Sequence, residues 1–123
     1  MLIKEIMKRP FVVEKNIGLA EAANIMSKKE IGSLLFVSGD KLKGIITEKD
    51  LIKNFSKHEN ISQAMTSKVI TVEAEESLDR AAEVMRENKV KRLPVVENGK
   101  LVGIITLTDI LANFEALEED FFF

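Results

Sequence analysis

The stretch Gly44-Ile45-Ile46-Thr47-Glu48-Lys49-Asp50 organises this chain, because it returns 59 residues later as Gly103-Ile104-Ile105-Thr106-Leu107-Thr108-Asp109. The same offset aligns residues 13–52 with residues 72–111 and gives 15 identities in 40 positions. Two unrelated segments of that length would share about two or three residues by chance. A repeat of this kind has to be interpreted before any other pattern. The 123 residues therefore divide into two similar halves.

Composition restricts the class of protein. Hydrophobic residues make up 46% and charged residues 31%, which is typical of a folded, soluble chain. The formal net charge of −2 gives the chain as a whole no basic surface for nucleic acid, and the absence of cysteine excludes disulfides and thiolate chemistry. No apolar run approaches the roughly 20 residues needed to cross a bilayer. We therefore expect a cytoplasmic protein with no membrane partner.

Each half predicts the same series of elements. A short β-branched strand is followed by a helix whose apolar positions repeat at i, i+3, i+4 and i+7, then by a two-stranded hairpin and a second helix. The apolar helical positions are Leu19, Ala22, Ala23 and Met26 in one half and Leu78, Ala81, Ala82 and Met85 in the other. The last helix is expected to run from Asp109 towards Glu119. We predict two β-α-β-β-α motifs, at residues 1–59 and 60–123, each beginning with its own short helix.

The repeated Thr-x-x-Asp pattern has two interpretations. A Thr followed three residues later by an acid, just before a helix, is a capping box that satisfies orphan backbone N–H groups. In both copies, however, a glycine and two apolar residues lead a buried strand straight into the helix start, where unpaired N–H groups suit phosphate. An Asp there is also a suitable acceptor for the two hydroxyls of a ribose. Capping and ligand binding are compatible, so both interpretations stay open.

Taken together, these motifs resemble the tandem cystathionine-beta-synthase (CBS) domain pair, as a stand-alone CBS-domain protein. The resemblance covers about Ile6 to Ala112 and rests on Met65-Thr-x-x-Val-x-Thr71-Val, on Arg92-Leu93-Pro94-Val95 and on both Gly-Ile-Ile-Thr-x-x-Asp motifs. It implies two pseudo-symmetric α/β halves packed through their sheets, with a cleft on either side. In that family the clefts bind adenine nucleotides (AMP, ADP or ATP) or S-adenosylmethionine, and the module serves in energy or metabolite sensing.

The resemblance also implies roles for individual residues. In the second half Asp109 would take the ribose hydroxyls, Thr106 the phosphate or ribose, and Arg92 the phosphates. The remaining ligand-binding candidates of this half are Val69, Thr71, Pro94 and Lys91, the first two lining the adenine pocket and Lys91 standing in a cationic cluster with Lys89. The candidates of the first half are Val12, Ser33, Thr47 and Asp50. Because Val12 replaces Thr71 and Ser33 replaces Arg92, we expect the two clefts to differ.

We expect a regulatory module without catalytic activity. The only histidine, His58, lies in a polar linker and has no second histidine or cysteine to pair with, so no catalytic residue, metal site or required cofactor is predicted. The module would report ligand occupancy to an unknown effector protein. The Ala-rich helix face, the apolar N-terminal turns and the Phe121–Phe123 end predict a homodimer. The alternatives are a structural dimerisation module with degenerate clefts and, less favoured, nucleic-acid binding.

Overall fold

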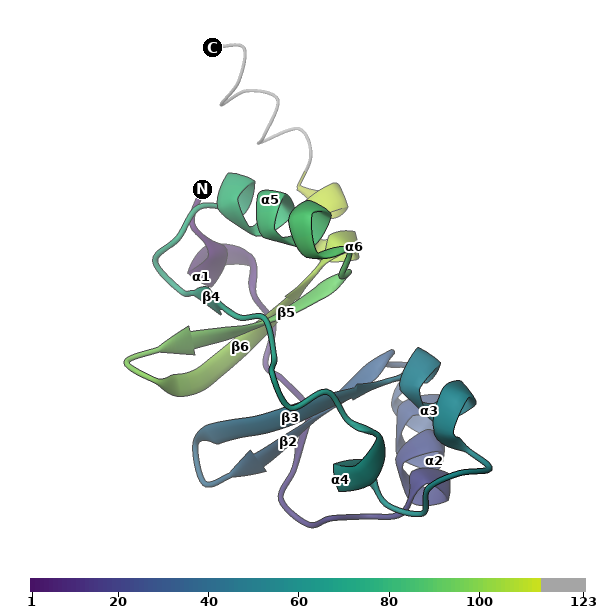
Figure 1. The fold of residues 1–123 in the computed structure, drawn as a ribbon. Helices are drawn as coiled ribbons and strands as arrows, with labels where there is room; N and C mark the ends of the chain where they lie inside the picture. Colours follow the sequence, from purple (N-terminus) through teal and green to yellow (C-terminus); the bar gives the residue numbers. More distant parts are fainter. Residues whose placement is uncertain (114–123) are drawn as a thin grey trace. The chain divides into compact units, whose positions relative to one another are not determined.

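Short strands and helices alternate along the chain in the order that the repeat predicts (Figure 1), and the computed structural model describes residues 1–113. The first half contains α1 (Ile3–Ile6), β1 (Val12–Val13), α2 (Leu19–Lys29), β2 (Ser33–Ser38), β3 (Lys41–Thr47) and α3 (Glu48–Asn54). The second half contains α4 (Ile61–Ala64), β4 (Val72–Glu73), α5 (Leu78–Asn88), β5 (Arg92–Glu97), β6 (Lys100–Thr106) and α6 (Leu107–Ala112). The α/β class and the β-α-β-β-α order are confirmed. The predicted extension of the last helix towards Glu119 and the Phe121–Phe123 end lie outside the described residues.

The strands form two three-stranded sheets, in the orders β1-β2-β3 and β4-β5-β6. In each sheet the short first strand runs parallel to the second, and the second pairs antiparallel with the third. Tight turns with left-handed backbone close the hairpins: Gly39 has φ 64°, and Asn98 and Gly99 have φ 53° and 77°. Asn98 and Gly99 thus form the kind of two-residue hairpin loop that needs two positive φ angles, for which Asn-Gly is a preferred pair.

Residues Phe11–Val69 form one compact unit. Its core lies between the sheet β1-β2-β3 and the helices α2, α3 and α4. The buried residues of this core are Leu19, Ala22, Met26, Leu34, Ile46, Leu51, Ile61 and Ala64. The predicted apolar stripe of α2 thus faces the interior, with Ala23 partly buried at its edge.

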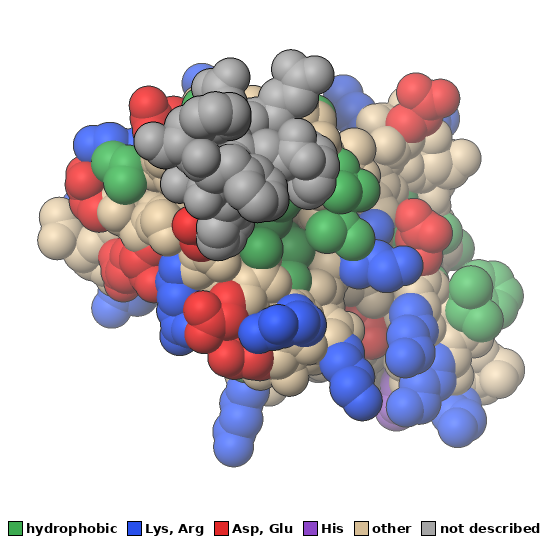
Figure 2. Space-filling model, turned by 90° about the horizontal axis from the view of Figure 1, so that it is seen from above, with side chains coloured by type: hydrophobic (Ala, Val, Ile, Leu, Met, Phe, Trp, Pro, Cys, Tyr) green, Lys and Arg blue, Asp and Glu red, His purple; other side chains and the backbone are tan. Residues whose placement is uncertain are grey.

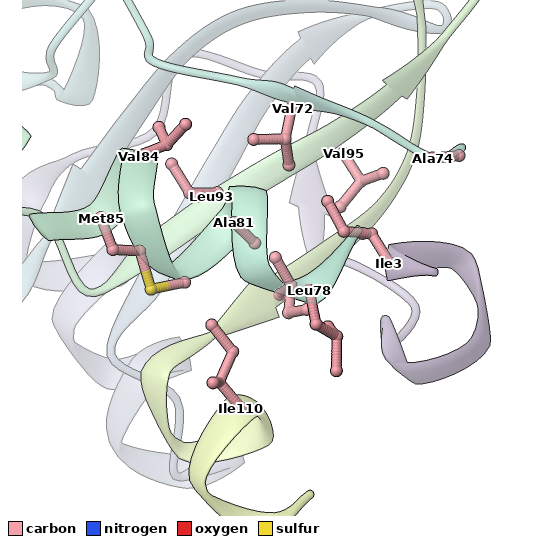
Figure 3. Close-up of a cluster of buried hydrophobic side chains, with 11 residues drawn as sticks. Ile3, Val72, Ala74, Leu78, Ala81, Val84, Met85, Leu93, Val95 and Ile110 are labelled. Atoms are coloured by element: carbon pink, nitrogen blue, oxygen red, sulfur yellow. The ribbon is translucent and has the colours of Figure 1, made fainter. Parts of the chain in front are cut away.

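Met1–Pro10 and residues 70–113 form the other unit. Its core comprises Ile3, Val72, Ala74, Leu78, Ala81, Val84, Met85, Leu93, Val95, Ile105 and Ile110 (Figure 3). Ile3 of α1 lies beside Leu78 of α5 and Val95 of β5 in this cluster and is fully buried. The N-terminal helix is therefore an integral part of the core of the second half.

The two short helices are exchanged between the halves, contrary to the expectation that each half begins with its own. The amides of Ile3 and Lys4 donate to the carbonyl oxygens of Glu76 and Ala74, at 2.8 and 3.0 Å. In the other unit the amide of Ile61, the first residue of α4, donates to the carbonyl of Ile17 at 3.0 Å. The division at residues 59/60 remains a description of the sequence repeat. In space the chain divides at residues 10/11 and 69/70.

A glycine in the third strand of each sheet accommodates the exchange. A Cβ at Gly103 would lie 2.5 Å from Sδ of Met7 and 3.2 Å from the carbonyl oxygen of Lys8. A Cβ at Gly44 would collide in the same way with Sδ of Met65. Each repeated Gly-Ile-Ile-Thr stretch therefore begins with a residue that leaves room for the methionine following an exchanged helix.

Candidate functional site

Each repeated Thr-x-x-Asp stretch forms a complete capping box where β3 or β6 leads into a helix. Asp109 Oδ2 accepts hydrogen bonds from the backbone N–H and the Oγ1 hydroxyl of Thr106, both at 2.9 Å, and the Asp109 amide donates to Thr106 Oγ1 at 3.2 Å. Asp50 and Thr47 make the same three contacts at 2.9, 3.0 and 3.3 Å. The capping interpretation is confirmed. It uses only one oxygen of each carboxylate, so Oδ1 remains available for another partner.

The sheet register places the proposed phosphate residue beside this capping box. Arg92 of β5 pairs with Thr106 of β6, and in the other unit Ser33 pairs with Thr47. Leu93 and Val95 point into the core. Since side chains alternate along a strand, Arg92 and Pro94 lie on the opposite face of the sheet.

Asp109 is the most buried charged residue of the site. Its side chain is 4% exposed, and its second oxygen, Oδ1, lies 2.9 Å from Nζ of Lys8. Burial raises the pKa of Asp109, but the hydrogen bond from Lys8, the two from Thr106 and the charge of Lys8 outweigh it and hold the pKa below its ordinary value. Asp109 is therefore a carboxylate that stays ionised although it is almost inaccessible.

Lys8 reaches Asp109 because of the exchanged helix. Its backbone pairs with Ile104 of β6 through two hydrogen bonds, with N···O distances of 2.9 and 3.0 Å. In the other unit the corresponding backbone pairing joins Thr66 to Ile45, at 2.9 and 3.0 Å. Asp50, which is half-buried, thus has a threonine where Asp109 has a lysine, and no ion pair to Asp50 is found among residues 1–113.

The other predicted site residues are distributed over the two units. The unit with Asp109 holds Thr71, Arg92, Pro94, Lys91 and Thr106, and the unit with Asp50 holds Val12, Ser33, Thr47 and Val69. Thr71 and Lys91 are exposed, Arg92 is half-buried, and Ser33 is buried. The β-branched stretch Val69–Val72 predicts the first strand of the second half, but β4 begins only at its last residue, Val72. Val69 belongs to the unit that does not contain Thr71.

Lys8 was not predicted as a site residue. The signal was present, since Met7 and Met65 stand at equivalent places and are followed by Lys8 and Thr66. Using it required knowing that the segment after α1 pairs with β6 rather than with its own half. Residues 1–113 contain no group of three or more His, Cys, Asp or Glu side chains that could hold a metal ion. None of their helices is long and apolar enough to span a bilayer.

The fold and these paired sites define a class of protein. It is a tandem α/β repeat in which an aspartate of a helix capping box lies at the strand-to-helix junction of each half. The model of the CBS domain family matches the chain twice, over residues 3–57 and 61–116. The chain belongs to this family.

Solved structures agree with this assignment. The CBS domain pair of protein MJ0100, determined in complex with 5′-methylthioadenosine and S-adenosyl-L-methionine, is 36% identical to this chain, with a TM-score of 0.87 over 95% of this chain and 98% of that one. A conserved protein from Pyrococcus horikoshii is 27% identical, with a TM-score of 0.84 over 92% and 91%.

Curated relatives place the same domain pair inside larger proteins. Inosine-5′-monophosphate dehydrogenase of Thermoplasma acidophilum is 33% identical over 109 residues, which are 88% of this chain and 22% of the enzyme. Homoserine O-acetyltransferase of Methanohalobium evestigatum is 36% identical over 101 residues, or 80% and 21%. The chain spans between about a fifth and a third of the length of the first relatives it matches.

Proposed function

We propose that this chain is a regulatory module that binds an adenosyl compound, either an adenine nucleotide or S-adenosylmethionine and its derivatives, and signals occupancy to a partner protein. The observation that carries the proposal is the geometry of Asp109, a buried, ionised carboxylate with one oxygen fixed by the capping box and the other turned to Lys8. Oδ1, the oxygen outside the capping box, can accept hydrogen bonds from the hydroxyls of a ribose once Lys8 gives it up. The likeness to a domain pair solved with two adenosyl compounds supports the choice of ligand.

The site residues then have distinct roles in the second half. Asp109 accepts the ribose hydroxyls, and Thr106 bonds the ribose or phosphate while its backbone remains capped. Arg92, whose backbone is paired with that of Thr106, supplies charge for phosphates. Thr71 and Pro94, which belong to the same unit as Asp109, contribute to the adenine subsite. A charged hydrogen bond contributes roughly 1.5–3 kcal/mol, so the cations decide how strongly phosphorylated ligands are preferred.

The first half offers a weaker version of the same site. Thr47 and Asp50 repeat the capping box, but Ser33 stands in the register position of Arg92. Val12 replaces Thr71 in the sequence alignment. Without a cation at these positions, we expect this half to favour uncharged groups or to remain the low-affinity site.

A regulatory role fits the residues better than catalysis or nucleic-acid binding. The relatives that are enzymes match this chain over about a fifth of their length, which supports an accessory module. Bound ATP should therefore stay intact. Figure 2 shows Lys and Arg side chains beside Asp and Glu side chains over part of the face it draws and grouped together over another part. Nucleic-acid binding is therefore disfavoured by the net charge of −2 rather than by the charge distribution on that face.

We also propose that the chain forms a homodimer, through exposed apolar side chains rather than through the Ala-rich helix face or the N-terminal turns. Ile3 of the N-terminal turns and Ala22 and Ala81 of the helix faces are buried within the units, so they leave no surface to hide. Apolar side chains are exposed instead at the end of α3, where Ile52 is 82% exposed and Phe55, the residue after the helix, is 67% exposed. Exposed apolar patches mark interaction surfaces, and two-fold dimers are the commonest homo-oligomers. We therefore propose that these two side chains are buried against a second copy of the chain.

The proposed function is tested by isothermal titration of the chain with AMP, ATP, S-adenosylmethionine and 5′-methylthioadenosine, with GMP as the control for the base. The expected result is binding of at least one adenosyl compound, with an affinity that falls about ten- to a hundredfold in Asp109→Asn. Absence of binding to all four at concentrations of about 1 mM, where interactions of only about 4 kcal/mol are still detected, would refute the proposed function.

A further inference from the structure

The ion pair between Lys8 and Asp109, where β6 leads into α6, is not needed for the capping box. Thr106 already uses Asp109 Oδ2 for both bonds of the capping box, and the amide of Asp109 completes it. Lys8 Nζ lies on the other oxygen, Oδ1, at 2.9 Å. Lys8 therefore occupies the oxygen that a ligand hydroxyl would use.

The backbone of Lys8 is fixed while its side chain is accessible. Two hydrogen bonds with Ile104 hold the main chain against β6. The Lys8 side chain is nevertheless 72% exposed, in contrast to the 4% exposure of Asp109. A long, solvated ammonium on a fixed anchor can leave the carboxylate and turn to another anion nearby without any movement of the sheet.

We propose that Lys8 sets the ligand selectivity of the second-half site by exchanging its ammonium from Asp109 to an anionic group at the 5′ position of the bound adenosyl compound. This inference rests on the proposed function. A ligand that takes Oδ1 with its ribose hydroxyls removes the partner of Lys8. A phosphate on the same ligand gives the ammonium a new partner, whereas an uncharged 5′ group does not.

The two ligand classes thus respond to Lys8 in different ways. For a phosphorylated ligand, Lys8 adds a charged hydrogen bond that compensates for the one it gives up. For an uncharged ligand, Lys8 only competes for Asp109. The first half lacks this device, because Thr66 takes the place of Lys8 beside Ile45. Selectivity for the 5′ group is therefore built into one half and absent from the other.

Isothermal titration of the whole chain with AMP and with 5′-methylthioadenosine tests the inference, using Asp50→Asn as the background to reduce the contribution of the first half. Lys8→Met should lower the ratio of AMP affinity to 5′-methylthioadenosine affinity about tenfold, the equivalent of one charged hydrogen bond. AMP binding should stay close to that of the parent, because the lost contact with the phosphate is offset by the freed Asp109 carboxylate, whereas 5′-methylthioadenosine binding should tighten. Lys8→Arg should keep the affinity ratio of the two ligands within about threefold of the parent's. Lys8→Gln replaces Lys8→Met if that variant does not fold, as judged by far-ultraviolet circular dichroism.

The matched control is Lys4→Met in the same N-terminal segment. Lys4 is also an exposed lysine in an ion pair, with Glu75 at 2.8 Å, but it does not contact Asp109. This variant should leave the ratio unchanged. If the parent binds both ligands and Lys8→Met leaves their ratio unchanged, the inference is wrong and the proposed function stands. If the parent binds neither ligand, the proposed function fails and this inference fails with it.

Discussion

Replacing Gly103 with alanine should destabilise the fold through a collision with Met7. The new Cβ would lie 2.5 Å from Met7 Sδ and 2.9 Å from its Cγ. Gly103 does not have a positive φ, so alanine is allowed there and by itself stabilises a strand position by about 0.5–1 kcal/mol. Overpacking a close contact costs about 1–3 kcal/mol. The free energy of unfolding should therefore fall by about 1 kcal/mol, the difference between these two effects.

Removing the methionine should reverse the sign of that effect. Met7→Ala alone should cost about 2 kcal/mol, the low end for a core methionine because Met7 is only partly buried. In the Met7→Ala background, Gly103→Ala should be neutral or stabilising by about 0.5 kcal/mol. The chain has no Trp or Tyr, so urea unfolding is followed by far-ultraviolet circular dichroism. Effects of the two changes that add to within about 0.5 kcal/mol would refute the packing of the exchanged segment on β6.

Three further predictions concern the site and the surface. Asp109→Asn should weaken adenosyl-ligand binding about ten- to a hundredfold in calorimetry, whereas Asp50→Asn should affect only a weaker site; the reverse pattern would show that the halves are misassigned. Burial raises the pKa of Asp109, but Lys8 and Thr106 hold it below its ordinary value, so its stabilising effect is present above about pH 4 and lost as the pH falls through the lowered pKa. Carbon-13 NMR titration should show a higher Asp109 pKa in Lys8→Met; an unchanged pKa would contradict the ion pair. Ile52→Glu with Phe55→Glu should convert the proposed dimer to a monomer of 13.8 kDa by light scattering, and a parent that is already a monomer would exclude the dimer.

Local and periodic patterns in the sequence predicted most of the elements. The capping boxes at Thr47 and Thr106 each depend on residues within four positions of one another. The apolar stripes of α2 and α5 depend only on helical spacing. These features could be predicted because the interactions that produce them join residues close together in the sequence.

Features that depend on contacts between residues far apart in the sequence could not be predicted from local patterns. The exchange of α1 and α4 places Ile3 in the core of the second half, although it is closer in sequence to the first. Lys8 became part of the site for the same reason. No local pattern distinguishes a short helix that packs on its own half from one that packs on the other, since both need the same apolar face.

The prediction of surface properties failed where burial was inferred from composition. The alanines that suggested an interface fill the cores, and Ala22 and Ala81 are fully buried. Ile52 of α3 and Phe55, which follows the helix, are exposed, and the sequence did not identify them as surface residues. A helix of seven residues is too short for its apolar positions to define one face with certainty.

The binding of an adenosyl compound at the capped end of β6 is tested most directly by NMR, through the backbone amides of Thr106 and Asp109. Both amides donate into the capping box and will sense any change in the Asp109 carboxylate or the Thr106 hydroxyl. Titration of the isotope-labelled chain with 5′-methylthioadenosine and with AMP should shift both signals, more strongly than those of Thr47 and Asp50. Saturable binding that leaves the Thr106 and Asp109 amides unmoved would contradict the assignment of the site.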